Sequence, residues 1–73
     1  MRKRLYLRVG DVIYHENRRA WGVGKVVEVK TSVLDGGPAL VRILFQDGRD
    51  RTFFNDLEDS MCCYYAGIRF YDY

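Results

Sequence analysis

The stretch Trp21–Val29, Trp-Gly-Val-Gly-Lys-Val-Val-Glu-Val, contains the pattern that decides the fold. Side chains alternate across an extended chain, so the two glycines lie on one side and leave that side open to a close neighbour. Val26 is in phase with the glycines, whereas Val27 and Val29 are in the opposite phase. A flat strand cannot bury all three valines, but a twisted strand with a bulge can, as at the corners of small barrels. The pattern therefore predicts a curled antiparallel sheet.

A phosphate-binding loop is the alternative interpretation of these glycines. A dinucleotide fingerprint has a third glycine, a Walker loop has a different spacing, and both continue into a helix. Here Gly22 and Gly24 are followed by a valine-rich, β-prone run. The glycines therefore predict a bend in a sheet, and we expect no cofactor.

Length and composition indicate one small domain over residues 1–73. The 73 residues include many aromatic and β-branched side chains, a balance typical of sheets. A chain of this size buries only about 60% of the surface that its unfolded form exposes, so its core is small. No apolar run is long enough to cross a membrane, and the basic start is not followed by a long apolar segment. We therefore expect a cytoplasmic, all-β domain.

Turn-forming residues divide the chain into strands. Gly10-Asp11 forms a turn into a first strand, Val12–His15, and a charged loop then leads to a second strand from Trp21 to about Lys30. Thr31–Pro38, which contains two glycines and the proline, has the chemistry of a turn. Ala39–Phe45 is the next expected strand, and its core-facing residues are Val41, Ile43 and Phe45.

Asp47-Gly48 is the strongest local signal in the chain. Both central positions of a type I′ turn need positive φ, which Asp-Gly tolerates. A two-residue turn places Gln46 opposite Arg49, and it sets Ile43 opposite Thr52 and Val41 opposite Phe54. The outer face of this hairpin would then carry Arg42, Leu44, Arg51 and Phe53.

A tyrosine-rich extension begins at about residue 58. Asn55 is a candidate cap for a short helix near residues 56–66, and Gly67 is its expected end. The apolar residues Leu57, Met61, Tyr64 and Tyr65 would share one face of that helix. Ile68–Tyr71 then forms a strand that pairs with an exposed edge and closes the sheet.

Metal binding and catalysis have little support in the sequence. Cys62 and Cys63 are adjacent, so on a strand they point apart, and we expect two reduced thiols with one in the core. With His15 as the sole histidine, one chain cannot assemble a zinc site from Cys and His ligands. His15 has no nucleophile in a recognisable context near it, so a structural role is expected. The chain is predicted not to be an enzyme.

The distribution of charge can steer an anionic partner to one side, although such asymmetry is also common on domains that bind nothing anionic. Up to Gly37 the chain has eight basic and four acidic residues, and after it four basic and six acidic residues. In the first part, Arg18, Arg19 and Lys25 flank Trp21, with Tyr14 on the neighbouring strand. Cations beside aromatic rings are typical of single-stranded nucleic-acid binding, and Arg2-Lys3-Arg4 could add phosphate contacts.

Protein binding is the other functional hypothesis. Small barrels have exposed sheet edges that can accept a partner strand. The mixed patch of Arg42, Arg51 and Phe53 on the predicted outer face could contact such a partner. The terminal aromatics Phe70, Tyr71 and Tyr73 could serve the same purpose, or could pack onto the body of the domain.

Four segments of the chain resemble a recurring pattern of small bacterial Tudor-like domains. They are Val9–His15, Trp21–Val26, Val41–Phe45 and Asp47-Gly48. Similar patterns occur in the C-terminal domain of UvrD and PcrA helicases, in the RNA-polymerase-interacting domain of CarD and of transcription-repair coupling factors, and in a small stand-alone bacterial family of unknown function. The resemblance spans roughly Val9–Leu57 and does not extend into the tyrosine-rich extension.

This resemblance implies an SH3-like barrel of about five antiparallel strands that binds a protein partner. RNA polymerase or a helicase is the partner that it suggests, in transcription or DNA repair. Direct nucleic-acid binding through the Arg18–Lys25 region is the alternative. The candidate contact residues are Tyr14, Arg18, Arg19, Trp21, Lys25, Arg42, Arg51 and Phe53.

Overall fold

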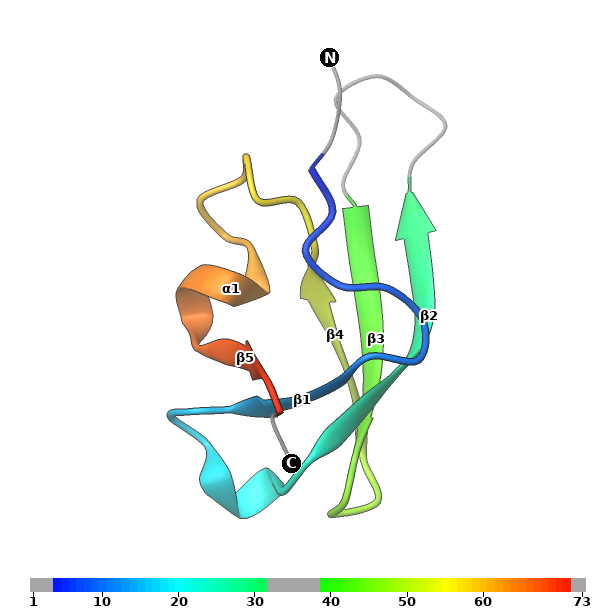
Figure 1. Ribbon diagram of the computed structural model, residues 1–73, viewed down its shortest axis with the longest axis vertical. Coiled ribbons are helices and arrows are strands. Elements are labelled where there is room, and N and C mark those ends of the chain that lie inside the picture. The colour runs from blue at the N-terminus through cyan, green and yellow to red at the C-terminus, as the bar shows by residue number, and fades with distance from the viewer. Residues whose placement is uncertain (1–3, 32–38, 72–73) are drawn as a thin grey trace.

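The computed structural model describes residues 4–31 and 39–71 of the chain (Figure 1). Of the features predicted above, most of the turn at Thr31–Pro38 lies outside the described residues. Arg2, Lys3 and Tyr73 also lie outside them.

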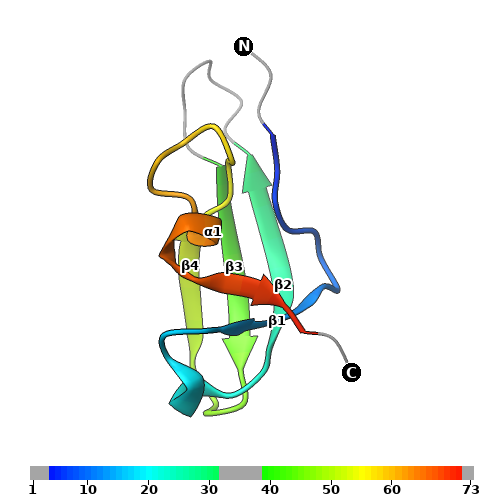
Figure 2. The same cartoon turned by 60° about the vertical axis from the view of Figure 1, so that its left-hand side comes forward.

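Five antiparallel strands form one sheet in the spatial order β4-β3-β2-β1-β5. Figure 2 shows β1 and β5 crossing the part of the sheet formed by β2, β3 and β4, so the sheet curls around its core. The prediction of a small all-β barrel of about five strands is therefore confirmed. The strands are β1 (Val12–His15), β2 (Gly24–Thr31), β3 (Ala39–Phe45), β4 (Asp50–Phe54) and β5 (Ile68–Phe70), with a 3-10 turn η1 (Arg19–Trp21) and a short helix α1 (Cys63–Ala66).

The predicted bulge lies in β2, the strand that joins the two parts of the sheet. β2 pairs with β3 along its length and with β1 at its start, and its register with β3 shifts between Val26 and Glu28. The shift leaves Val27 40% exposed while Val26 is buried. Val29 packs against the core from a partly buried position. The predicted bulge is therefore confirmed, but it turns only two of the three valines inward, and the expectation that all three are buried is wrong.

Gly24 lies at a closely packed point of the sheet. It pairs with Phe45 across the β2–β3 ladder and with Ile13 across the β1–β2 ladder. A Cβ at this position would lie 2.6 Å from Cγ2 of Ile43 and 2.9 Å from Cδ1 of Phe45. The absence of a side chain thus allows β1 and β3 to share this part of the core.

The β3–β4 hairpin differs from the predicted register by one residue. The N–H of Phe45 donates to the carbonyl of Arg49 at 3.0 Å, and the N–H of Gly48 donates to the carbonyl of Phe45 at 3.0 Å. Gly48 has a φ of 87°, whereas no residue other than glycine has positive φ among the described residues. The loop is therefore a three-residue turn with a glycine bulge, and the predicted type I′ turn is wrong.

This register shift moves two predicted surface residues into the barrel. Val41 lies opposite Phe53, and Ile43 lies opposite Arg51. Because side chains alternate along a strand, a shift of one residue exchanges the two faces of β4. Phe53 accordingly packs against the core. The predicted outer patch of Arg42, Arg51 and Phe53 does not exist as one surface.

The segment after β4 corrects the predicted helix start. Asn55 is fully buried and caps no helix. Its Oδ1 accepts from the N–H of Leu7 at 2.8 Å, and its Nδ2 donates to the carbonyl of Leu7 at 2.9 Å. The helix begins only at Cys63 and ends at Gly67, whose φ is 122°. The predicted helix end is confirmed, and the predicted cap is wrong because Asn55 joins the N-terminal segment to the sheet.

The predicted last strand is confirmed as β5, which pairs with the edge of β1 from Ile13 opposite Phe70 to His15 opposite Ile68. Two isolated bridges connect other segments to the chain around the end of β4, one from Leu5 to Asp56 and one from Phe54 to Cys62. Both cysteines are buried, so the expectation of only one core thiol is wrong. The fully packed core consists of Leu7, Ile13, Val26, Val41, Ile43, Phe45, Cys62, Cys63 and Ile68.

Candidate functional site

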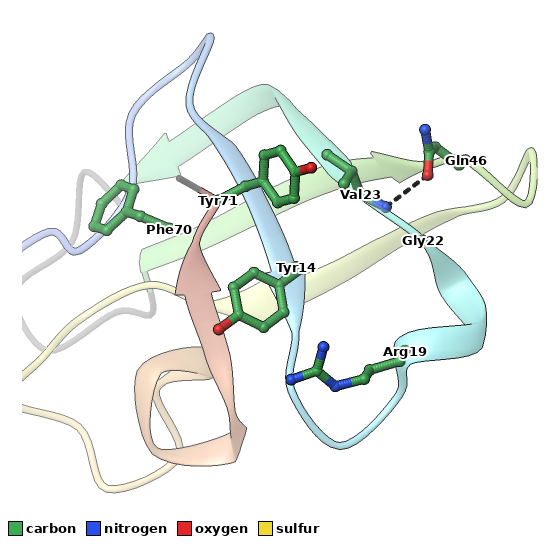
Figure 3. A pocket seen from close by; sticks show the side chains of 7 residues that line it. All are labelled: Tyr14, Arg19, Gly22, Val23, Gln46, Phe70 and Tyr71. Atoms are coloured by element: carbon green, nitrogen blue, oxygen red, sulfur yellow. Dashed lines mark hydrogen bonds between the residues drawn. The ribbon is translucent and has the colours of Figure 1, made fainter. Parts of the chain in front are cut away.

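A groove of about 330 Å³ lies where β1, β5 and the residues before β2 meet the tip of the β3–β4 hairpin (Figure 3). Three aromatic side chains and one arginine contribute to its lining. No acidic residue lines it within the described part of the chain. The lining residues are Tyr14, Arg19, Gly22, Val23, Gln46, Phe70 and Tyr71.

Two tyrosines form the aromatic wall of this groove. Tyr14 extends from β1, and Tyr71 directly follows β5, the neighbouring strand. Their ring centroids lie 6.4 Å apart at an interplanar angle of 82°, an edge-to-face contact. The N–H of Tyr71 donates to the carbonyl of Val12 at 2.9 Å, which continues the β1–β5 ladder beyond Phe70. Tyr71 is 41% exposed, so the wall presents ring surface to the solvent.

Arg19 lies at one end of the groove as the first residue of η1. Its guanidinium carbon lies 5.5 Å from the centre of the Tyr14 ring, within range of a cation–π contact. Figure 3 shows Tyr14 between Arg19 and Tyr71. Arg19 is exposed, and no carboxylate in the described ranges forms an ion pair with it. The groove therefore has a positive end.

Gln46 fixes the opposite wall. Its Oε1 accepts from the N–H of Val23 at 3.0 Å, and its own N–H donates to the carbonyl of Val23 at 3.0 Å. Gly22 has a φ of 78°, and a Cβ there would lie 2.5 Å from the same Oε1. These contacts hold the hairpin tip against the residues that precede β2. The wall is therefore positioned before any ligand binds.

Trp21 is partly buried and lies outside the lining of the groove. The guanidinium of Arg51 lies 3.8 Å from the centre of the Trp21 ring, and Phe45 contacts that ring edge-to-face at 5.2 Å. Arg51 also donates to both carboxylate oxygens of Asp47, at 2.8 and 3.3 Å. These hydrogen bonds, followed by one from the Arg49 backbone, hold the pKa of Asp47 below its usual value. Trp21 is therefore a structural ring with a cation already stacked on it.

His15 is buried and packs against other residues of the domain. It is 7% exposed, and its ring contacts Trp21 edge-to-face at 5.2 Å. Nδ1 accepts from the N–H of Asn17 at 3.1 Å. Burial, followed by the charge of Arg18, lowers the pKa of His15. The histidine is therefore held neutral, which agrees with the structural role expected from the sequence.

Six of the eight candidate contact residues from the sequence lie in three different places. Tyr14 and Arg19 line the groove. Arg51 and Phe53 contact the ring of Trp21, and all three residues are partly buried. Arg42 lies on the outer face, 45% exposed at its side chain, where it pairs with Glu28 at 3.2 Å and Asp50 at 3.0 Å.

Arg18 and Lys25 are exposed and lie next to the groove residues in the chain. Lys25 borders a second shallow hollow, and Val23 and Gln46 line both this hollow and the groove. The two depressions are therefore neighbours across one wall. Arg18 precedes η1 directly, and neither Arg18 nor Lys25 lines the groove.

Sequence reasoning did not assign Gly22, Val23 and Gln46 to a site. It named Phe70 and Tyr71 only among the terminal aromatics. The signal that could have placed these two beside Tyr14 is the predicted pairing of the last strand with an exposed edge. Gln46 joins the wall through the register of the hairpin tip, which the sequence predicted wrongly.

No family model, no curated protein and no solved structure matches this chain. No helix in residues 4–31 and 39–71 has the length and apolar character needed to cross a membrane.

Proposed function

We propose that the chain is a non-enzymatic binding module that holds a segment of a protein partner in the groove between Tyr14, Tyr71 and Gln46. The observation that supports this function best is the combination of exposed aromatic surface, one exposed arginine and a prepositioned polar wall in a single depression. Ligand sites typically combine an apolar lining with a few placed polar groups.

The size of the groove suits part of a peptide. Its volume of about 330 Å³ is at the lower end of ligand pockets, which run from about 300 to 1,000 Å³. A groove of this size can take a few side chains of an extended segment. The resemblance to Tudor-like domains suggests RNA polymerase or a helicase as the protein that supplies the segment, in transcription or DNA repair.

Capture from a bacterial lysate with the full chain immobilised tests this function. A double variant, Arg19→Ala with Tyr71→Ala, removes both ends of the groove. A second double variant, Arg42→Ala with Leu44→Ala, removes a cation and an apolar side chain from the outer face. We expect the same partner on the wild type and on the outer-face variant, and loss of that partner on the groove variant. Loss on the outer-face variant alone would reject the groove as the binding site.

Nucleic-acid binding is the second candidate function. It is favoured by Arg18, Arg19 and Lys25, which are exposed and have no ion-pair partner among the described residues. Fluorescence anisotropy with single-stranded and duplex oligonucleotides tests it. Binding that weakens with salt and with Arg18→Ala plus Arg19→Ala would support this function. Absence of binding at low salt would remove it.

A further inference from the structure

We infer that the partner segment is acidic and apolar, with an Asp or Glu side chain at Arg19 beside an apolar side chain at the Tyr71 end of the groove. This inference rests on the proposed function and names the chemistry of its ligand. It follows from the charge of the groove, from the geometry of its rings and from the distribution of ion pairs over the molecule.

Charge complementarity supports an acidic ligand. Ten lysines and arginines lie in the described residues, and five of them form ion pairs there. Among the described residues, the acidic residues nearest to the groove in the chain are already paired, since Glu16 pairs with Arg69 at 3.6 Å and Asp47 pairs with Arg51 at 2.8 Å, whereas Asp72 lies outside the described residues. The five cations without such a partner are Arg8, Arg18, Arg19, Lys25 and Arg49, and three of these lie in the Arg18–Lys25 region.

The position of Arg19 favours a carboxylate within the groove itself. Contact with the Tyr14 ring holds the guanidinium beside the groove, so less side-chain freedom is lost when an anion binds. A guanidinium can donate two parallel hydrogen bonds to a carboxylate. Charge-assisted hydrogen bonds of this kind are stronger than bonds between neutral groups.

The remaining lining favours an apolar neighbour to that carboxylate. Tyr71 is 41% exposed, and Val23 lies on the facing wall. The ring of Phe70 points away from this surface and contacts Tyr6 edge-to-face at 5.2 Å (Figure 3). The surfaces of Tyr71 and Val23 lie at the end of the groove away from Arg19 (Figure 3). An apolar side chain would remove them from water, while a polar one would gain less.

The same geometry is a poor match for a single strand of nucleic acid. Successive bases need open ring faces, but Tyr14 and Tyr71 meet at 82° and Arg51 lies over Trp21. A phosphate backbone also needs a row of cations, and Arg19 is the one cation in the groove lining of the described chain.

Selection from a library of short random peptides on the full chain tests this inference. Enriched peptides are synthesised with a fluorophore, and their dissociation constants are measured by anisotropy. We expect Asp or Glu next to Leu, Ile or Phe in the enriched sequences. Arg19→Ala should weaken these peptides by about tenfold or more, since a hydrogen bond to a charged group contributes about 1.5–3 kcal/mol. A selection on Arg19→Glu should lose the acidic residue.

Arg8→Ala is the matched control, because it removes an exposed arginine that also lacks an ion pair among the described residues and does not line the groove. It should change the dissociation constants by less than about twofold. Unchanged tryptophan emission checks that each variant is folded.

Amide chemical shifts locate the bound peptide. Neutral or basic peptides that shift the resonances of Tyr14, Arg19 and Tyr71 would overturn the inference and leave the proposed function standing. If no peptide shifts these resonances, the proposed function fails as well. Shifts of the same resonances by a thymidine oligonucleotide alone would support the nucleic-acid candidate and reject the acidic peptide.

Discussion

Asn55 shows how one polar side chain can organise the core of a small domain. It is fully buried, and both its amide groups bond to the backbone of Leu7. These bonds attach the segment before β1 to the end of β4. A buried donor and acceptor that lose their partner cost about 1–3 kcal/mol each.

We therefore expect Asn55→Ala to lower the free energy of unfolding by about 2–6 kcal/mol, because two buried groups of Leu7 lose their partner. Urea denaturation followed by tryptophan fluorescence measures the change. Asn17→Ala is the control, since Asn17 is exposed and its amide donates to the carbonyl of Ala66 at 3.2 Å. A smaller loss for Asn55→Ala than for Asn17→Ala would contradict this role.

Gly24 is the residue at which close packing leaves no room for a side chain. A methyl group there would meet Ile43 at 2.6 Å and Phe45 at 2.9 Å. Overpacking of this kind typically costs about 1–3 kcal/mol, and we expect Gly24→Ala to lose that much stability. The exposed neighbour Lys25→Ala should change stability by less than about 0.5 kcal/mol in the same denaturation experiment. A Gly24→Ala variant as stable as wild type would show that the sheet can open here.

His15 should make stability depend on pH. Its pKa is lowered by burial and then by Arg18, so the unfolded chain binds a proton at higher pH than the folded chain does. Above about pH 6.5 both states are neutral, and stability is unaffected. As the pH falls below that value, the unfolded state binds the proton first and stability decreases. Urea midpoints between about pH 7.5 and 5.5 measure this loss, and His15→Gln should flatten the profile.

At the scale of elements, the β3–β4 hairpin determines which side chains reach the barrel interior. Its three-residue turn places Arg51 over the ring of Trp21, whereas Arg42 stays on the outer face. Arg51→Ala should therefore uncover the indole. We expect a red shift of the tryptophan emission and stronger quenching by acrylamide.

Arg42→Ala is the control for this prediction, because it removes the same charge from the other face of the hairpin. It should leave both the emission maximum and the quenching unchanged. Equal quenching in the two variants would be inconsistent with the register that pairs Ile43 with Arg51.

The strands β2 and β3 could be predicted from the sequence because burial determines their pattern of apolar and polar residues. Val41, Ile43 and Phe45 alternate with exposed residues, and the phase change at Val27 marks the bulge. The hairpin register could not be predicted, since Asp-Gly fits both a two-residue and a three-residue turn, which differ in the position of one hydrogen bond.

The candidate site was predictable only in part, because some of its contacts also depend on strand register. Tyr14 and Arg19 belong to one local stretch, so their proximity follows from the chain order. Phe70 and Tyr71 reach them through the β1–β5 pairing, and Gln46 through the hairpin tip. Contacts between distant segments depend on register, and a pattern of residues does not encode their geometry.

At the scale of the whole molecule, the reactivity of the two buried cysteines measures unfolding of the domain. Burial raises the pKa of Cys63 to about 12, with a further contribution from Cys62. Thiolates are the reactive form, so the raised pKa of Cys63 and the burial of both thiols disfavour modification of the folded protein. We expect no reaction with a disulfide reagent at neutral pH in the native state and two equivalents per chain in denaturant. Rapid modification of the folded chain would contradict the packing of this region.

The pairing of β1 with β5 has a consequence for the time course of folding. Ile13 must find Phe70, a residue far along the chain, before the first strand has a second neighbour. Contacts between such distant positions slow folding, because the intervening loop loses entropy before the contact forms. During synthesis, one edge of β1 therefore stays unpaired until Ile68–Phe70 has left the ribosome. Closure of this barrel is therefore a late event in biogenesis, and the groove beside Tyr14 is completed only then.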